Sequence, residues 1–482
     1  MKTPQEFTDS LHGLKHEVYI LGEKAESVTE HPILRPSLNA LAKTYEMAHD
    51  PRYIELFVRQ GLDGERVNCF TSLHQSTQDL LNKVKALRIL GQETGTCFQR
   101  CVGWDALNAV ESTTFEMDQA LSQGTQYHSR FMDYLHYVQQ NDLVCNGAMT
   151  DVKGDRGLRP SQQADPDMFL HVVERRSDGI VVRGAKAHQT GAVFSHEIIV
   201  MPTLTMRADD KDYAVAFAIP SDTEGVIHVL GRQSCDTRKL EGSTMDVGNA
   251  TFGGHEALVI FNDVFVPSER VFMDGEWQFS RVLVERFAGY HRQSYGGCKV
   301  GVGDVLIGAA ATAAEYAGVA KASHVRRKLG EMIHLNETIF ACGLGCSVAG
   351  TAMTSGTYLV DLLLANVCKQ NVTRFPYEIA RLAEDLAGGL MVTMPSEKDL
   401  NHLEIGALLE KYLRGVAEIP TADRMRILRL IENLTLGTAA VSYRTESMHG
   451  AGSPEAQVIM IGRLSDLERK QALAKRLAGI EL

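Results

Sequence analysis

The stretch at residues 286–299 reads Arg-Phe-Ala-Gly-Tyr-His-Arg-Gln-Ser-Tyr-Gly-Gly-Cys-Lys and concentrates ligand-type and acid–base side chains among glycines. A second stretch, Cys97-Phe98-Gln99-Arg100-Cys101, lies far upstream. Its two cysteines are four positions apart, a spacing that puts both on one face of a helix. With His291 and Cys298 they would supply three sulfurs and one imidazole, a set suited to zinc or to an iron–sulfur cluster. We therefore predict that the fold brings these two stretches together.

A rival cysteine pair, Cys342 and Cys346, has the same spacing, so spacing alone does not choose between the pairs. The rival pair lies in an uncharged, small-residue segment, where cysteine behaves as a buried hydrophobe. Cys97 and Cys101 flank Arg100 in a polar, partly positive setting that favours thiolates. This context favours Cys97 and Cys101 as ligands, and a structural pair of buried thiols is the alternative.

His291 and Cys298 are seven residues apart, which is two turns of a helix if the helix is continuous. Gly296 and Gly297 between them make a continuous helix doubtful and would let backbone approach a cofactor closely. The alternative for His291 is a hydrogen-bonded structural role.

Composition sets the broad class of protein. The chain has 482 residues, 44% hydrophobic and 23% charged, and a net charge of −11. These values are typical of a globular protein and argue against a general role on nucleic acid or acidic membranes. The N-terminus lacks the apolar region of a signal peptide. Nine cysteines, an odd number, argue against a disulfide framework and favour a reducing cytoplasm.

One uncharged stretch, residues 338–360, is long enough to span a bilayer. It is interrupted by many glycine, serine and threonine residues, and neither flank carries a basic cluster. We predict a helix buried within the protein or between subunits, and no membrane association.

The order of patterns predicts an α+β protein in three parts. Residues 1–145 have mostly helical periodicity. Residues 146–275 hold short β-rich runs, including a hairpin that turns at Ser177-Asp178-Gly179, and predict an antiparallel β-domain. Residues 276–482 predict a helical bundle whose apolar helices need partners on several faces, so the bundle should oligomerise through itself.

Four runs, at residues 97–103, 183–191, 285–299 and 444–454, closely resemble the 4-hydroxybutyryl-CoA dehydratase family, and the likeness covers nearly the whole chain. The broader family includes flavin-dependent 4-hydroxyphenylacetate 3-monooxygenases, which share the fold but not the cluster ligands. The helix–strand–helix order also resembles the acyl-CoA dehydrogenase architecture.

The resemblance implies a homotetramer that carries FAD and a [4Fe–4S] cluster in each active site. Carried over by position, the cluster ligands are Cys97, Cys101, His291 and Cys298. Zinc held by the same four residues is the alternative.

The resemblance also implies a flavin site at the entry to the β-domain and at a strand end. A glycine pair would meet the flavin from a neighbouring subunit; taken alone, this pair reads as a helix break. The implied flavin-site residues are Asn146, Met149, Thr150, Lys153, His188, Gln189, Thr190, Gly388 and Gly389.

The implied reaction is dehydration of 4-hydroxybutyryl-CoA to crotonyl-CoA, with isomerisation of vinylacetyl-CoA at the same site. General acid–base catalysis supplies only ~10²–10⁴-fold, too little to remove an unactivated β-hydrogen. A flavin-generated substrate radical would acidify that position, and a cluster iron would act as Lewis acid on the departing hydroxyl.

Six residues in or near the matching runs are the catalytic candidates, although a glutamate taken alone is most simply a surface charge. We expect His291 and Glu446 to handle protons, and Tyr295 and Glu256 to orient substrate and leaving water. Thr190 and Lys299 would bond the flavin or the thioester carbonyl. The rival functions are a flavin-dependent aromatic monooxygenase and a non-enzymatic redox-sensing metalloprotein.

Overall fold

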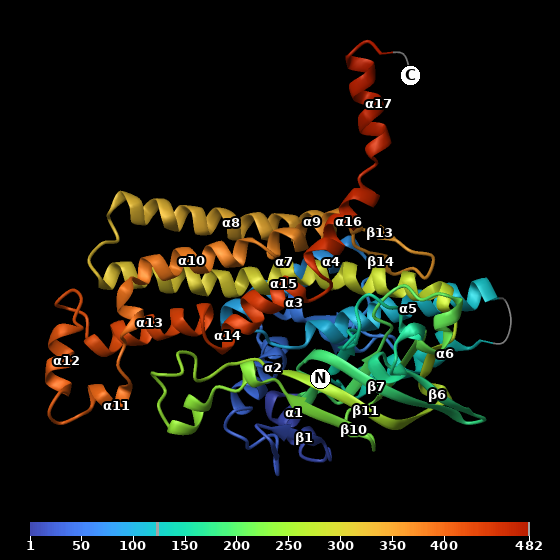
Figure 1. Cartoon of the computed structure of the whole chain (residues 1–482), viewed down its shortest axis with the longest axis horizontal. Helices are drawn as coiled ribbons and strands as arrows, with labels where there is room; N and C mark the ends of the chain where they lie inside the picture. The colour runs from blue at the N-terminus through green and yellow to red at the C-terminus, as the bar shows by residue number, and fades with distance from the viewer. Residues whose placement is uncertain (122–124, 481–482) are drawn as a thin grey trace.

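The computed structural model describes residues 1–121 and 125–480 and shows a long slab of helices lying against a β-rich region (Figure 1). The helices are α1 Pro4–Leu11, α2 Arg35–His49, α3 Ile54–Phe57, α4 Thr77–Thr94, α5 Cys101–Leu121, α6 Tyr127–Gln140, α7 Trp277–Tyr316, α8 Ser323–Val348, α9 Leu362–Val372, α10 Phe375–Ala387, α11 Glu397–Leu400, α12 Gly406–Tyr412, α13 Thr421–Thr435, α14 Thr438–Ala440, α15 Ser447–His449, α16 Pro454–Leu464 and α17 Leu467–Leu477.

The strands form two larger sheets and two small hairpins. The six-stranded sheet has the order β2-β1-β10-β11-β7-β6, and the four-stranded sheet has the order β12-β9-β8-β5. The strands are β1 Glu17–Ile20, β2 Glu23–Lys24, β3 Val58–Gln60, β4 Arg66–Asn68, β5 Cys145–Ala148, β6 His171–Arg176, β7 Gly179–Thr190, β8 Glu197–Val200, β9 Val215–Pro220, β10 Val226–Leu230, β11 Glu256–Pro267, β12 Val271–Asp274, β13 Thr351–Ala352 and β14 Tyr358–Leu359.

The predicted α+β class is confirmed, and the predicted hairpin forms between β6 and β7 in antiparallel register. Two details of the predicted β-domain are wrong. Strand β1 comes from the segment predicted to be helical and pairs with β10 in parallel, and β5 pairs with β8 in parallel. The two larger sheets share one apolar core, in which Phe217 of β9 meets Phe261 of β11 edge to face. The three-part division and the acyl-CoA dehydrogenase likeness stay predictions.

Helix α7 runs unbroken for 40 residues through Gly296 and Gly297, so the predicted interruption is wrong. The glycines admit neighbouring helices instead of a cofactor. A Cβ built on Gly297 would lie 2.4 Å from the carbonyl oxygen of Val84 on α4, and one on Gly301 would lie 2.1 Å from that of Arg88. A Cβ on Gly296 would lie 2.7 Å from the Cα of Gly343 on α8. Close packing on both sides stabilises the helix by more than the glycines weaken it.

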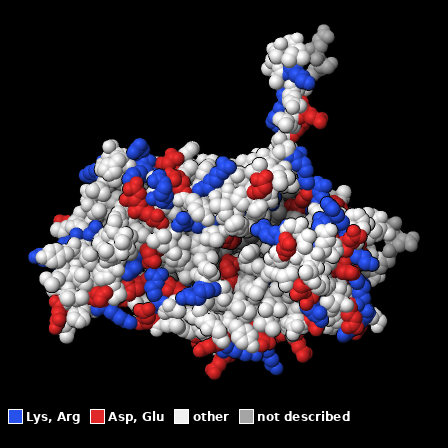
Figure 2. Space-filling model, in the orientation of Figure 1, with Lys and Arg blue, Asp and Glu red and all other residues white. Residues whose placement is uncertain are grey.

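The predicted buried helix over residues 338–360 is also wrong in part. Helix α8 ends at Val348, which is 63% exposed, and the β13–β14 hairpin follows. Among the residues described, one helix, α7, is long and apolar enough to cross a membrane, and 67% of its apolar window is buried within the protein. A core helix passes the same test, so this is weak evidence for a membrane span. Figure 2 shows basic and acidic side chains interspersed on this face, unlike the one-sided basic surface of a nucleic-acid-binding protein.

The close approach of α4 and α7 predicts different outcomes for two glycines on the same helix. Gly301→Ala should lower the midpoint of thermal unfolding by at least about 2 °C, because overpacking a core costs roughly 1–3 kcal/mol. Gly308→Ala is the matched control, since nothing lies within 4 Å of its Cβ position. Differential scanning calorimetry of both variants checks this, and equal shifts would contradict the packing described.

Candidate functional site

The first cysteine pair lies at a chain reversal between two helices rather than on one helix face. Helix α4 ends at Thr94 and is capped by Gly95, which adopts the left-handed conformation, and Cys101 is the first residue of α5. Cys97 therefore lies in the connection, and the predicted single helix is wrong for this pair. Gln99, with φ of 66°, holds the connection through its amide, which donates to the Ser37 carbonyl and accepts from the Ser37 hydroxyl.

The structure brings the three predicted thiols and His291 together in the interior. All four residues are buried, and the Cys101 thiol donates a hydrogen bond to Cys298. Burial alone would raise the pKa of Cys298, but this hydrogen bond and the charge of Lys299 outweigh it and lower that pKa. Burial, followed by the charge of Glu446 and of neighbours that include Cys298, raises the pKa of Cys97 well above its usual value.

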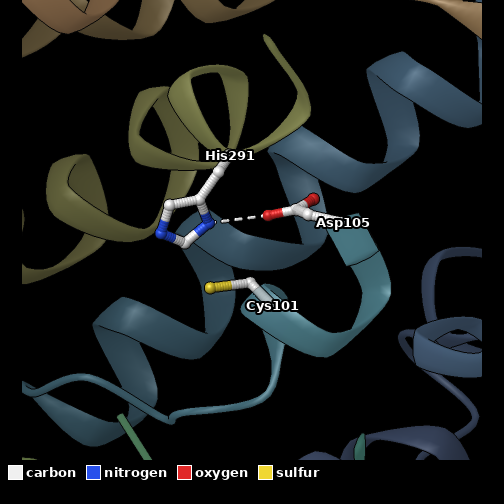
Figure 3. A group of neighbouring side chains, drawn as sticks. All are labelled: Cys101, Asp105 and His291. Carbon is white, nitrogen blue, oxygen red and sulfur yellow. Dashed lines mark hydrogen bonds and ion pairs between the residues drawn. The ribbon is translucent and has the colours of Figure 1, made fainter. Parts of the chain in front are cut away.

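Asp105 orients the imidazole of His291. The sulfur of Cys101 and the carboxylate of Asp105 are both directed toward the imidazole, and ligand atoms of the three residues lie within 4.8 Å of one another (Figure 3). His291 Nδ1 donates to Asp105 Oδ2 at 2.7 Å, which leaves Nε2 free to ligate. The other carboxylate oxygen accepts from Lys83 Nζ at 2.5 Å. Asp105 is therefore already satisfied and supports the ligand.

The rival cysteines lack such surroundings. Cys346 Sγ donates to the Gly343 carbonyl at 3.1 Å, and Cys342 accepts from Asn371. Among the described residues, they form no group with a histidine that could hold a metal. The choice of Cys97 and Cys101 as ligands stays a prediction.

A cavity of about 510 Å³ has His291 in its wall. Strand ends of the β-rich region, α7 and a C-terminal segment form its wall together. The predicted residues that line it are Met149, Thr150, His188, Gln189, Thr190, Glu256, His291, Tyr295 and Glu446.

Besides the three cysteines, five predicted residues do not line this cavity, and they lie in different places. Asn146 lies behind the wall, where its Nδ2 donates to the Thr190 carbonyl at 2.7 Å and its Oδ1 is buried without a partner. Lys299 reaches the site through Glu446, and Lys153 lies nearby at partial burial. Gly388 and Gly389, after α10, have nothing within 4 Å of their Cβ positions.

Glu446 is the centre of an acid–base network and has two buried partners, Tyr295 and Lys299. It accepts from Tyr295 Oη at 2.8 Å and from Lys299 Nζ at 2.5 Å. Burial alone would raise the pKa of Glu446, but Lys299 and the hydrogen bonds outweigh it and lower that pKa. Burial raises the pKa of Tyr295 well above its usual value, and the charge of Glu446 adds to this.

Glu256 faces the same cavity, and its pKa is shifted in the opposite direction. Burial raises the pKa of Glu256 well above its usual value, and the nearby charge of Glu446 adds to the shift. Its Oε2 accepts from Thr190 Oγ1 at 2.6 Å. Two carboxyl groups on one cavity with pKa values pushed apart are the pattern of an acid and a base.

The segment that carries Glu446 is irregular. Residues Val441–Glu446 form a π-helix. This conformation is rare in proteins, and where it occurs it is often at a functional site. Sequence reasoning identified Glu446 but missed this geometry, and it missed the buried charges that support the site: Lys83, Asp105, Arg292 and Lys369. A usable signal existed for Asp105, which lies one helical turn after Cys101 on α5.

Two family models together match nearly the whole chain. The 4-hydroxyphenylacetate 3-hydroxylase N-terminal family matches residues 3–273, and the C-terminal family of the same name matches residues 280–479. The chain belongs to the 4-hydroxyphenylacetate 3-hydroxylase family.

The chain is much more similar in sequence to some members of the 4-hydroxyphenylacetate 3-hydroxylase family than to others. The chain is 58% identical to 4-hydroxybutyryl-CoA dehydratase/vinylacetyl-CoA-Delta-isomerase of Clostridium aminobutyricum, over 100% of both chains. It is 27% identical to a 4-hydroxyphenylacetate 3-monooxygenase oxygenase component of Thermus thermophilus, over 90% of this chain and 88% of that one. An oxygen-tolerant archaeal 4-hydroxybutyryl-CoA dehydratase from N. maritimus superimposes with a TM-score of 0.97 at 54% identity, covering 100% of this chain and 95% of that one.

The positions of the thiols predict which cysteines the protein needs in order to retain metal. Cys298→Ser should lose most of the bound metal of protein purified without oxygen, because it removes one of the four converging ligands. Cys346→Ser is the matched control, a buried thiol on another helix, and should keep the metal content of the parent. Metal analysis of both variants checks this, and equal metal content in the two would contradict the assignment.

Proposed function

We propose that this chain catalyses dehydration of 4-hydroxybutyryl-CoA to crotonyl-CoA and isomerisation of vinylacetyl-CoA to crotonyl-CoA. The observation that carries the proposal is the convergence of three thiols and an imidazole beside a cavity lined by Glu446, Tyr295 and Glu256. The relative at 58% identity, whose name states both activities, supports it.

The ligand residues fit an iron–sulfur cluster by their chemistry. Three soft sulfurs and one imidazole, all buried and with His291 already oriented by Asp105, suit a [4Fe–4S] cluster held by Cys97, Cys101, Cys298 and His291. Zinc with the same residues is the alternative. A bound cluster would supply a Lewis-acidic iron for the departing hydroxyl group.

The cavity wall fits a flavin. Its lining includes Met149, Thr150, His188, Gln189 and Thr190, from the end of β7 and the loop that follows β5. The buried, unpartnered Oδ1 of Asn146 lies behind that wall and offers one acceptor to a cofactor donor. FAD is the flavin present in solved structures of 4-hydroxyphenylacetate 3-monooxygenase. A bound FAD would supply one-electron oxidation of the substrate, which no side chain provides.

The chain's own residues divide the proton handling. Glu446 is the anionic group, and Tyr295 and Lys299 orient both of its oxygens, so it accepts a proton in a fixed direction. The raised pKa of Glu256 favours its protonated form, which can donate to the leaving hydroxyl. The Thr190 hydroxyl already donates to Glu256, so toward a flavin or thioester it can only accept. His291 Nε2 either ligates or takes a proton, and Asp105 fixes its direction for both.

We also propose a homotetramer whose flavin sites are shared between subunits. Helix α17 projects away from the body (Figure 1), and its Leu467, Leu473 and Leu477 are exposed. An apolar face of this kind favours a partner surface. The open space around Gly388 and Gly389 is compatible with approach by a neighbouring subunit. Mass photometry tests the assembly, and a monomer at micromolar concentration would contradict it.

The proposed setting is a reducing cytoplasm. All nine cysteines are free thiols in the structure, and eight of them are buried. A thiol set that must bind a cluster needs a compartment that keeps it reduced.

The test of function is turnover combined with cofactor analysis of protein purified without oxygen. We expect brown protein with iron, acid-labile sulfide and FAD that converts 4-hydroxybutyryl-CoA to crotonyl-CoA. Yellow protein without iron that consumes oxygen and reduced flavin would instead indicate a monooxygenase. Metal without acyl-CoA turnover would indicate a redox-sensing metalloprotein.

The imidazole ligand makes a separate prediction. His291→Cys should keep iron, because a fourth thiolate completes the ligand set, but dehydration should fall at least ~100-fold since the neutral proton-accepting ligand is lost. Iron content and crotonyl-CoA formation are measured on the same sample. Full dehydration activity in this variant would contradict a chemical role for His291.

A further inference from the structure

Two buried cations beside the cavity have no role in the proposed chemistry. Arg292 on α7 is 6% exposed, and Lys369 on α9 is fully buried. Among the described residues, no carboxylate lies within ion-pair distance of either one, whereas nearby Lys299 is paired with Glu446. A buried cation without a carboxylate partner costs several kcal/mol in desolvation, so its retention requires a reason.

Both cations donate to carbonyl groups of one segment, residues 441–451. Arg292 Nε and Nη2 donate to the Ala451 carbonyl at 3.1 Å and 2.9 Å, and Lys369 Nζ donates to the Ser447 carbonyl. Lys299 adds a third bond, to the Ser442 carbonyl at 2.6 Å. Three buried cations therefore hold the beginning, middle and end of this segment.

The segment needs such support because its backbone is irregular. It passes from the π-helix into the one-turn helix α15 and then to Ala451, which has φ of 55°, outside the range that non-glycine residues favour. Such backbone persists only when its surroundings fix it. Six of its residues line the cavity: Val441, Thr445, Glu446, His449, Gly450 and Ala451.

Helix α9 and Tyr295 complete the arrangement. Asn366 lies one turn before Lys369, and its Oδ1 accepts from Arg292 Nη1 at 2.8 Å, which fixes the guanidinium. Lys369 Nζ lies 4.1 Å from the ring centroid of Tyr295, whose hydroxyl donates to Glu446. The ammonium thus contacts both the segment and the tyrosine that orients the Glu446 carboxylate.

We propose that Arg292 and Lys369 are positioning residues that clamp the 441–451 segment to α7 and α9, so that Glu446 meets the acyl-CoA substrate in its reactive orientation. The catalytic part of this inference rests on the proposed function. Burial lowers the pKa of Lys369 to about 7, so the contribution that the contacts support is positional. Its amine bonds the Ser447 carbonyl and packs on the ring of Tyr295, whose hydroxyl donates to Glu446.

The experiment compares Lys369→Met and Lys369→Arg with the parent in the holoenzyme. Lys369→Met should lower kcat for dehydration by about 10–100-fold with KM within about threefold, because a hydrogen bond from a charged group is lost at a step that needs orientation. Iron and FAD content should match the parent. Lys369→Arg should recover part of kcat, because it restores charge and donor.

Arg424→Met is the matched control. Arg424 also donates to a backbone carbonyl, that of Leu413 at 2.6 Å, but between α13 and the end of α12 and away from the cavity. Its loss should leave kcat unchanged. Hydrogen exchange of peptides covering residues 441–451 provides a readout that does not depend on turnover: exchange should be faster in Lys369→Met and unchanged in Arg424→Met.

The two measurements distinguish failure of the clamp from failure of the proposed function. An inactive parent contradicts the proposed function, and the exchange data then test the clamp alone. Unchanged kcat and unchanged exchange in Lys369→Met overturn the clamp. If Lys369→Met does not fold, Asn366→Ala replaces it, since it loosens Arg292 without removing a charge. In this variant kcat should fall several-fold while the iron content stays that of the parent. If both kcat and hydrogen exchange equal those of the parent, the clamp is overturned.

Discussion

The structure depends on backbone contact between α4 and α7. Gly91 on α4 and Gly297 and Gly301 on α7 lie where any side chain would collide with the facing helix. This contact fixes the position of α7, which carries His291 and Cys298, against the end of α4, from which the chain leads to Cys97 and Cys101. The crossing of these two helices therefore sets the positions of both pairs. A small change in the distance between the helices would separate the thiols. The long helix thus acts as the scaffold of both the thiol site and the cavity.

Burial and charge then set the chemistry of the site. Lys83 and Asp105 orient His291 from one side, while Lys299, Lys369 and Arg292 surround Glu446 and its segment from the other. In a low-dielectric interior these charges act strongly on one another. The result is two carboxyl groups on the wall of the same cavity whose pKa values are shifted in opposite directions, that of Glu446 downward and that of Glu256 upward.

Residue type and local resemblance predicted which side chains meet, because ligand chemistry restricts the choice to cysteines and histidine. Local patterns failed where tertiary packing decides. Gly296 and Gly297 suggested a break, yet contact with α4 and α8 keeps α7 intact. The four residues of β1 were too short a pattern to reveal a strand that joins a distant sheet. Asp105, Arg292 and Lys369 resemble surface charges in a sequence, and only the fold shows that they are buried.

The central claim is that Cys97, Cys101, His291 and Cys298 hold one iron–sulfur group beside the cavity. The most direct measurement is a crystal structure of protein handled without oxygen, with anomalous diffraction recorded on both sides of the iron absorption edge. The account predicts strong iron density enclosed by the three Sγ atoms and His291 Nε2. Anomalous density that disappears below the zinc absorption edge would identify zinc and contradict the account. Side chains of residues 97 and 101 that point away from α7 would also contradict it.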